Sequence, residues 1–413
     1  MEWLLHRYLK GLKSGVMMKA FSFSGSGLEY FKIWIVNVLL IIVSLGLYYP
    51  WAKVRNKRYF YANTQLEARN FEYHATGKQL FLGFLLSAGM LLLYTTIQSI
   101  SPVGSVVLIA GLFLAFPWLF WQSLKFNMRM TSFSNVHFSF DAGLGQAYIN
   151  YMLIPMGAFV ALYGLPIMLA VAIPAMGGEI STLASVGMGL LSLLFFALVI
   201  FLFAFMKKRT MRYTMNGSRY GQGQFSSRVE TNVFAKILFK ATGLGILMTI
   251  AVFVALGVFA WMAGMASHLQ DLPAALEDPE ATAEVFTGAL VGLVGLAYLG
   301  VLIISMVVFS YLYSRQREYI FANTELDNKI AFASTLKART LAWISVTNLL
   351  AILVTFGLAF PWVQVRMSRF VLAHSWVDTS VGFDEYLTQQ QDEQSSLGDQ
   401  IGDAFDLDMG VGL

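Results

Sequence analysis

Eight long apolar runs restrict what this 413-residue chain can fold into. An α-helix needs about 18 or more apolar residues to cross roughly 30 Å of hydrocarbon. The runs lie near residues 31–49, 80–97, 103–121, 151–175, 182–206, 241–265, 285–310 and 341–360. Hydrophobic residues make up 57% of the chain and charged residues only 13%, which is more apolar than a water-soluble core requires. The sequence predicts an all-α polytopic transmembrane bundle.

Charge is segregated between alternate loops. Basic residues follow the first, third, fifth and seventh runs, whereas the segment between the sixth and seventh runs carries five acidic residues and no basic one (Asp271, Glu277, Asp278, Glu280 and Glu284). Loops rich in Lys and Arg stay in the cytoplasm. We therefore expect a multi-pass protein of a bacterial inner membrane, with its basic loops inside the cell.

The number of crossings is left open between six and eight. Eight simple crossings would put both termini outside, yet residues 1–20 form a basic segment, and short basic segments resist translocation. Re-entrant first and last runs, entering and leaving on the cytoplasmic side, would instead give six crossings with both termini inside. We treat the two arrangements as equal alternatives.

An internal repeat distinguishes the first and last runs. Residues 37–59 read NVLLIIVSLGLYYPWAKVRNKRY and residues 348–370 read NLLAILVTFGLAFPWVQVRMSRF. Weaker copies of the basic, aromatic helix end lie between them, and Phe-led polar segments recur at Phe21, Phe71, Phe138, Phe225 and Phe332. The unit is a short extended cytoplasmic piece followed by membrane sequence, repeated about five times. The predicted bundle thus contains six to eight membrane helices, internal pseudo-repeats and short extended cytoplasmic segments.

The repeated motif supplies most of the candidate site residues. Gly46, Pro50, Gly357 and Pro361 are typical of helix breaks, because proline removes a backbone donor and glycine eases departure from the helix. Aromatic and basic residues follow each break, and we expect them at the membrane interface or on lipid headgroups: Trp51, Arg55, Arg58, Trp362, Arg366 and Arg369. Interfacial anchoring is favoured over a substrate site for this set.

Asn37 and Asn348 form the candidate intramembrane polar pair. They occupy equivalent repeat positions inside apolar sequence, where an amide needs a partner. They would face each other or line a polar cavity, or each would make an interhelical hydrogen bond that holds the bundle together. The hydrogen bond is the favoured interpretation.

Several chemistries lack a sequence signal. The chain has no cysteine, its five histidines are isolated, and neither a zinc motif nor a phosphate-binding glycine loop occurs. No acidic or basic residue lies near the middle of an apolar run, which disfavours a buried proton relay. We expect no catalytic residue, no metal, no cofactor and no nucleic-acid partner, and we do not expect an enzyme. Membrane lipids are the expected partners, since headgroup phosphates are the phosphates nearest the basic loops.

The chain divides into three parts. A basic segment covers 1–20, a transmembrane domain covers 21–376, and an acidic tail covers 377–413 with nine acidic residues and no basic one. Alone the tail cannot form a core. It is either a solvated tail or a docking segment that returns to the protein's own basic loops or to a partner, and the sequence favours neither.

The motifs resemble the YjgN family of bacterial inner-membrane proteins, a domain of unknown function. The resemblance rests on residues 21–25 and 30–34, on the run from Leu45 to Arg55, on residues 58–64 and 71–73, and on the acidic ending at 402–408. It implies fold and location but no activity. It also suggests a membrane-associated metallopeptidase as a partner.

Two functions from different classes follow. One is a transporter or channel-like protein for a small solute or lipid, with a pathway lined by the repeated segments that carry Asn37, Pro50, Asn348 and Pro361. The other is a non-transporting membrane scaffold or an accessory subunit of a membrane-associated protease. A hydrated cavity that reaches the midplane would favour the first, and a solid bundle with an exposed tail would favour the second.

Overall fold

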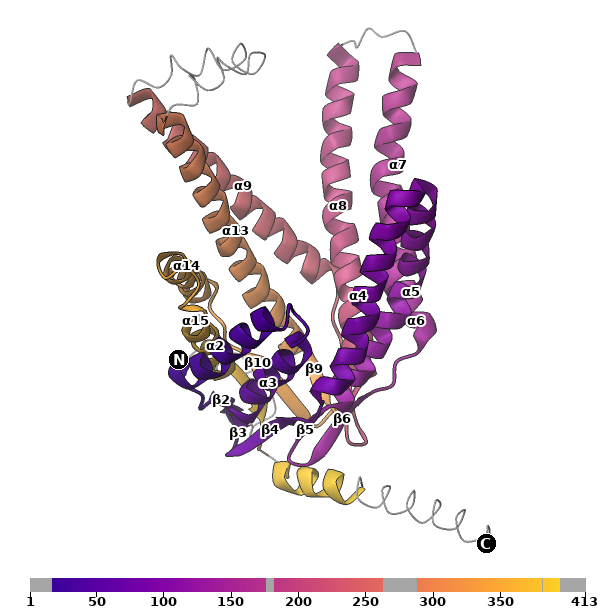
Figure 1. Ribbon diagram of the computed structural model, residues 1–413. Coiled ribbons are helices and arrows are strands. Elements are labelled where there is room, and N and C mark those ends of the chain that lie inside the picture. Colours follow the sequence, from indigo (N-terminus) through magenta and orange to yellow (C-terminus); the bar gives the residue numbers. More distant parts are fainter. Residues whose placement is uncertain (1–16, 176–181, 263–287, 381, 394–413) are drawn as a thin grey trace.

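The fold combines long helices with a ring of short strands at one end (Figure 1). The computed structural model describes residues 17–175, 182–262, 288–380 and 382–393. Eleven strands form one antiparallel sheet in the order β1-β11-β10-β9-β8-β7-β6-β5-β4-β3-β2. The edge strands β1 (Met18–Ala20) and β2 (Ser22–Phe23) are consecutive in the chain, so the sheet curls into a nearly closed barrel.

The barrel consists of five hairpin-like pairs, one for each repeat. Four are true hairpins: β3 (Thr64–Leu66) with β4 (Arg69–Tyr73), β5 (Thr131–Phe133) with β6 (Val136–Phe140), β7 (Ser218–Tyr220) with β8 (Gly223–Ser227), and β9 (Thr324–Leu326) with β10 (Ile330–Ser334). The fifth joins the two ends of the chain, because β11 (Ser375–Asp378) pairs with β1. Met18 lies opposite Asp378 and Ala20 opposite Trp376.

Each pair is connected to the next by a helical hairpin. The outgoing and returning helices are α2 (Gly27–Val43) and α3 (Tyr49–Ala62); α4 (Gly77–Ile100) and α5 (Pro102–Arg129); α6 (Leu144–Tyr148), the π-helix η1 (Ile149–Leu153) and α7 (Ile154–Ala175) with α8 (Thr182–Gly217); α9 (Thr231–Met262) and α13 (Gly288–Ala322); and α14 (Ala338–Val354) and α15 (Phe360–Ala373). Each returning helix packs against the outgoing helix of the next repeat, and α15 packs against α2. The five repeats therefore form a closed ring.

The all-α prediction was wrong. The 11-stranded barrel overturns it, because the pieces expected to be merely extended pair with one another into one sheet. These strands are two to five residues long. Strands this short carry almost no periodicity, and the pairing of β1 with β11 joins residues from opposite ends of the chain.

Six helices in the described part of the chain are long and apolar enough to cross a membrane, and they come from the three middle repeats. The first and last repeats differ. At 1.5 Å per residue, the 17-residue helices α2 and α14 reach only about 25 Å. Each then turns back to the barrel at a left-handed glycine, Gly46 (φ +91°) or Gly357 (φ +90°). This arrangement corresponds to the alternative with six crossings and re-entrant ends.

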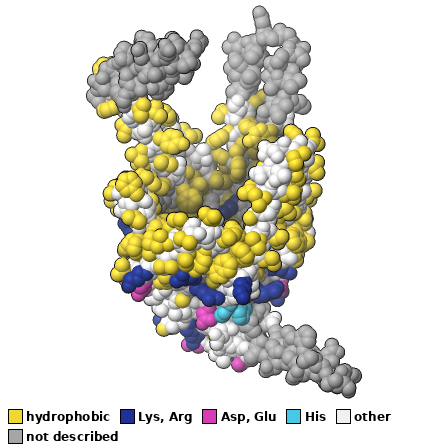
Figure 2. All heavy atoms as spheres, viewed as in Figure 1, with side chains coloured by type: hydrophobic (Ala, Val, Ile, Leu, Met, Phe, Trp, Pro, Cys, Tyr) yellow, Lys and Arg dark blue, Asp and Glu magenta, His cyan; other side chains and the backbone are white. Residues whose placement is uncertain are grey.

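Hydrophobic and basic side chains are distributed differently between the helices and the barrel. Hydrophobic side chains cover the helices, and Lys and Arg side chains form a belt where the helices meet the barrel (Figure 2). Such a belt is expected at the cytoplasmic boundary of a membrane protein. The acidic loop at 271–284 and the basic segment up to residue 16 lie outside the described residues.

Candidate ligand cavity at the mouth of the barrel

Five phenylalanines form a ring inside the barrel. Equivalent positions in the second strands supply Phe71, Phe138, Phe225 and Phe332, and Phe21 takes this place between β1 and β2. Ring centroids of Phe21 and Phe71 lie 6.1 Å apart, and those of Phe225 and Phe332 lie 5.9 Å apart. This Phe ring packs against the buried apolar core of the barrel.

Beneath the Phe ring the barrel is packed with apolar side chains. The remaining cavity has a volume of about 70 Å³ and is lined almost wholly by apolar and aromatic residues. Its far end is closed by a helix over 383–393, which buries Phe383, Tyr386 and Leu387 in the same core. The described residues along the barrel axis therefore form an apolar, largely filled interior.

This closing helix belongs to the acidic tail, and it contacts four hairpin turns. The Arg69 guanidinium pairs with Asp384 at 2.9 Å, and the Tyr386 hydroxyl donates to Asp327 Oδ2 at 2.7 Å. Gln390 Oε1 accepts from the backbone N–H of Gln222 at 2.6 Å, and Gln391 donates to the carbonyl of Ser134. The part of the tail at 383–393 thus docks on the protein's own barrel, and 394–413 lies outside the described residues.

Above the Phe ring lies a larger cavity, here called the central cavity, of about 570 Å³. It is an open cavity lined by residues of α3, α13, α15 and the barrel mouth. Its wall is mostly apolar and aromatic (Phe21, Phe60, Phe71, Phe321, Phe332, Met367, Val371 and Leu372). A volume of this size with few polar groups is typical of small-molecule sites. Arg317 is the one basic residue among the lining residues.

Arg317 has no carboxylate partner in the described part of the chain. Its guanidinium donates to Ser375 Oγ at 2.9 Å and to the Tyr313 hydroxyl at 3.4 Å, and it lies 4.2 Å from the centre of the Phe321 ring. Its Nε is buried without a hydrogen-bond partner. A largely desolvated cation without an anion is costly, so an anion would complete this site.

The predicted polar pair does not meet. Asn37 and Asn348 are buried, at 2% and 4% exposure, each within its own helical hairpin. Arg55 donates to Asn37 Oδ1 at 3.3 Å, and Arg366 donates to Asn348 Oδ1 at 3.0 Å. Arg55 and Arg366, both predicted for the interface, are exposed residues that also bind the buried asparagines.

The remaining interfacial candidates hold successive repeats together. Arg58 donates to the carbonyl of Ala75 at 2.8 Å, and Arg369 donates to that of Gly25 at 2.9 Å. The indoles of Trp51 and Trp362 lie against Gly77 and Gly27, where no Cβ would fit. Both contacts join a returning helix to the next repeat, and the second one closes the ring.

The predicted helix breaks lie at the turns. Pro50 and Pro361 occupy the first turns of α3 and α15, where the missing N–H has no intrahelical acceptor in any case.

The sequence did not predict two features of the site. Arg317 was visible only as one of several basic residues after the seventh run, and the convergence of the five phenylalanines was not foreseen. No cluster of metal-ligating side chains occurs among the described residues.

Comparisons with known proteins place the chain in a family. Residues 18–404 match the model of a family described as bacterial protein of unknown function (DUF898). The chain belongs to this family. It is 27% identical to the inner membrane protein YjgN of Salmonella typhimurium over 363 residues, covering 86% of this chain and 87% of the relative. It is 34% identical to YjgN of Escherichia coli O157:H7 over 136 residues, covering 32% and 34% of the two chains.

No solved structure matches the chain. The family, the named relatives and the six apolar helices together identify a multi-pass inner-membrane protein.

Proposed function

We propose that this protein is a lipid transporter that takes the anionic head of a membrane lipid into the central cavity. The observation that carries the proposal is Arg317, a cation with no counter-charge among the described residues, in a mostly apolar cavity at the membrane boundary. A phosphate on its guanidinium would supply the missing acceptor, because Arg binds phosphate through two parallel hydrogen bonds.

The shape of the membrane part supports a lipid rather than a water-soluble ligand. Figure 2 shows a hollow between the two groups of long helices, walled by hydrophobic side chains with a basic side chain at its floor. Acyl chains match such walls, whereas a hydrated solute does not. The packed barrel interior also argues against an aqueous pore along the axis.

The re-entrant repeats offer lateral access. α15 and α2 are neighbours in the ring, so the two short helical hairpins lie side by side (Figure 1). α3 and α15 also form part of the wall of the central cavity. Above these hairpins the wall of long helices is interrupted, and a lipid can enter from the bilayer without crossing a protein barrier.

Lipid binding by purified full-length protein tests the proposal. We expect Arg317→Gln to weaken binding of phosphatidylglycerol about tenfold, the loss expected for one charge-assisted contact, when binding is titrated in an uncharged detergent by native mass spectrometry. Arg212→Gln removes an exposed arginine from another long helix and is the matched control. Equal binding by both variants would refute the cavity as the lipid site.

Transport requires a second measurement. In vesicles that contain fluorescent phosphatidylglycerol, the wild-type protein should accelerate quenching of inner-leaflet lipid by an external reductant, and Arg317→Gln should slow this reaction. Thermal unfolding excludes a folding defect, since removal of an uncompensated charge should leave the unliganded variant at least as stable as the wild type. If the protein binds lipid but does not accelerate its movement between leaflets, it is a lipid-binding protein and the transport function is refuted.

A further inference from the structure

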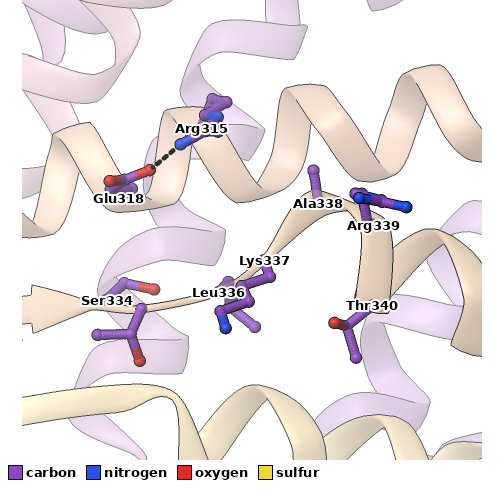
Figure 3. Close-up of a pocket in the computed structure, with 9 residues that line it drawn as sticks. Arg315, Glu318, Ser334, Leu336, Lys337, Ala338, Arg339 and Thr340 are labelled. Atoms are coloured by element: carbon purple, nitrogen blue, oxygen red, sulfur yellow. Dashed lines mark hydrogen bonds and ion pairs between the residues drawn. The ribbon is translucent and has the colours of Figure 1, made fainter. Parts of the chain in front are cut away.

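A second cavity lies on the outer side of α13, between this helix and the start of α14. It has a volume of about 480 Å³. Arg315 and Glu318 on α13 form one wall, and residues 334–340, which connect β10 to α14, form the other (Figure 3). Arg317 is not among its lining residues, so this cavity is separate from the central cavity.

The start of α14 lacks the side-chain cap that is present at the starts of α2 and α4. Ser26 and Thr76 cap α2 and α4 with complete capping boxes. The equivalent position before α14 is Lys337, whose side chain makes no capping hydrogen bond. Residues 338–340 line the cavity, and their backbone N–H groups lack the side-chain acceptor found at the starts of α2 and α4. Free amides at a helix start attract anions.

A buried hydroxyl in the same cavity also lacks a partner. Ser334 is only 1% exposed, and its Oγ makes no hydrogen bond within the described structure. Its side chain lines the cavity and faces it in Figure 3. The neighbouring Thr335 hydroxyl is engaged, since it accepts from Trp376 Nε1 at 3.1 Å. A buried hydroxyl is rarely left unsatisfied, so Ser334 marks a place for an external hydrogen-bonding group.

The charges of the cavity favour an anion. Arg315, Lys337 and Arg339 line it, against one acidic residue, Glu318. Glu318 pairs with Arg315 at 2.9 Å, and no carboxylate in the described part of the chain pairs with Lys337 or Arg339 on the opposite wall. Both are exposed and can close over a ligand.

We propose that this cavity is a phosphate-binding site, in which the free amides of α14, the Ser334 hydroxyl, Lys337 and Arg339 hold the phosphate group of a lipid headgroup or of a soluble phosphate compound. The phosphate oxygens accept from the amides and the hydroxyl, and the two cations neutralise the charge. This inference does not depend on the lipid-transport proposal, because the two cavities share no lining residue.

Substitutions at equivalent repeat positions test this site. Arg339→Gln removes a proposed contact, whereas Lys78→Gln changes the equivalent residue of the capped helix α4 and is the matched control. Lys337→Ser introduces a hydroxyl at the cap position, as Ser26 and Thr76 do in α2 and α4, so it should keep or raise the melting temperature while occupying the amides that the phosphate needs. Ser334→Ala removes the unsatisfied hydroxyl, and the loss of this one oxygen atom is too small to leave a cavity in the core.

Two titrations of full-length protein distinguish the source of the phosphate. Inorganic phosphate is titrated by calorimetry into detergent-purified protein, and phosphatidylglycerol is titrated by native mass spectrometry into the Arg317→Gln protein, where the central cavity is disabled. We expect Arg339→Gln and Lys337→Ser to weaken binding at least about tenfold and Lys78→Gln to leave it unchanged. Loss in the inorganic phosphate titration indicates a soluble ligand, and loss confined to the lipid titration indicates a headgroup. Equal binding by Lys337→Ser, Arg339→Gln and Lys78→Gln in both titrations would overturn the site.

Discussion

Buried asparagines inside the helical hairpins are held by arginines of the returning helices. This pairing occurs three times: Arg55 with Asn37, Arg366 with Asn348, and Arg209 Nε with Asn150 Oδ1 at 3.1 Å. An amide and a guanidinium in apolar surroundings each need a partner, and here each satisfies the other. These residues therefore join the outgoing and returning helices of one repeat.

The two terminal repeats differ at one partner, which permits a residue-scale prediction. Asn37 Nδ2 donates to Asn56 Oδ1 at 3.0 Å, but the residue equivalent to Asn56 is Met367, and Asn348 Nδ2 is left without an acceptor. Met367→Asn should stabilise the protein by about 1 kcal/mol, the usual worth of one hydrogen bond. Thermal unfolding in detergent measures the change. The reciprocal Asn56→Met should destabilise by about 1–3 kcal/mol, and a similar effect of both substitutions would contradict the pairing.

The Trp51 contact gives a second residue-scale prediction. A Cβ built on Gly77 would lie 2.2 Å from Trp51 Cδ1, so Gly77→Ala should force the indole away and cost about 1–3 kcal/mol of unfolding free energy. Gly83 lies on the same helix with no atom within 4 Å of its Cβ position, and Gly83→Ala should be neutral or slightly stabilising. Melting temperatures of the two variants in detergent check the contrast. Equal losses would show that helix propensity, and not the indole, decides the outcome.

At the scale of elements, the sequence predicts the helices far better than the sheet. A run of 18 apolar residues is a strong local signal, and the turns at Gly46 and Gly357 follow from the repeated glycine and proline. The Phe-led segments are recognisable as extended, but the partner of each strand is supplied by another repeat. Arg317 escaped prediction for the same reason: α13, α15 and the barrel mouth assemble its cavity from residues far apart in the chain.

The docked helix at 383–393 yields a prediction about pH. Burial raises the pKa of the Tyr386 hydroxyl above its ordinary value of 10.0, and Asp327, which accepts its hydrogen bond, raises this pKa further. A group whose pKa is higher in the folded state stabilises below its unfolded pKa and loses that contribution as the pH rises. We therefore expect the helix to detach in alkaline solution, above about pH 10.

A spin label on the exposed position Thr388 reports this detachment as a gain in mobility. Tyr386→Phe removes the ionisable hydroxyl while keeping the ring, so its label mobility should not change with pH over the same interval. Tyr220 also has a raised pKa because of burial and faces the helix, and the comparison with Tyr386→Phe separates the two residues. An unchanged transition in the Phe variant would assign the effect to Tyr220.

At the scale of the whole molecule, the ring has five repeats, but in the described part of the chain only three of them contain helices long and apolar enough to cross a membrane. The barrel needs all five, because a nearly closed sheet leaves few unpaired strand edges. The wall of long helices needs fewer than five repeats. The two short repeats lie next to each other, where α15 packs against α2. The wall is therefore low on the side of these two repeats, next to the central cavity.

Cysteine labelling at the tips of the two short repeats tests this arrangement. Leu45 and Phe356 are 94% and 97% exposed at the ends of α2 and α14, and side chains this apolar belong in lipid. In the cysteine-free chain, Leu45→Cys and Phe356→Cys should resist an impermeant maleimide in intact cells and in inverted vesicles. Ser99→Cys, at the far end of α4, should react in intact cells, and Ser226→Cys, in strand β8, only in inverted vesicles. Labelling of Leu45→Cys in intact cells would mean that the first repeat crosses the membrane, and the lateral gap on which lipid access depends would close.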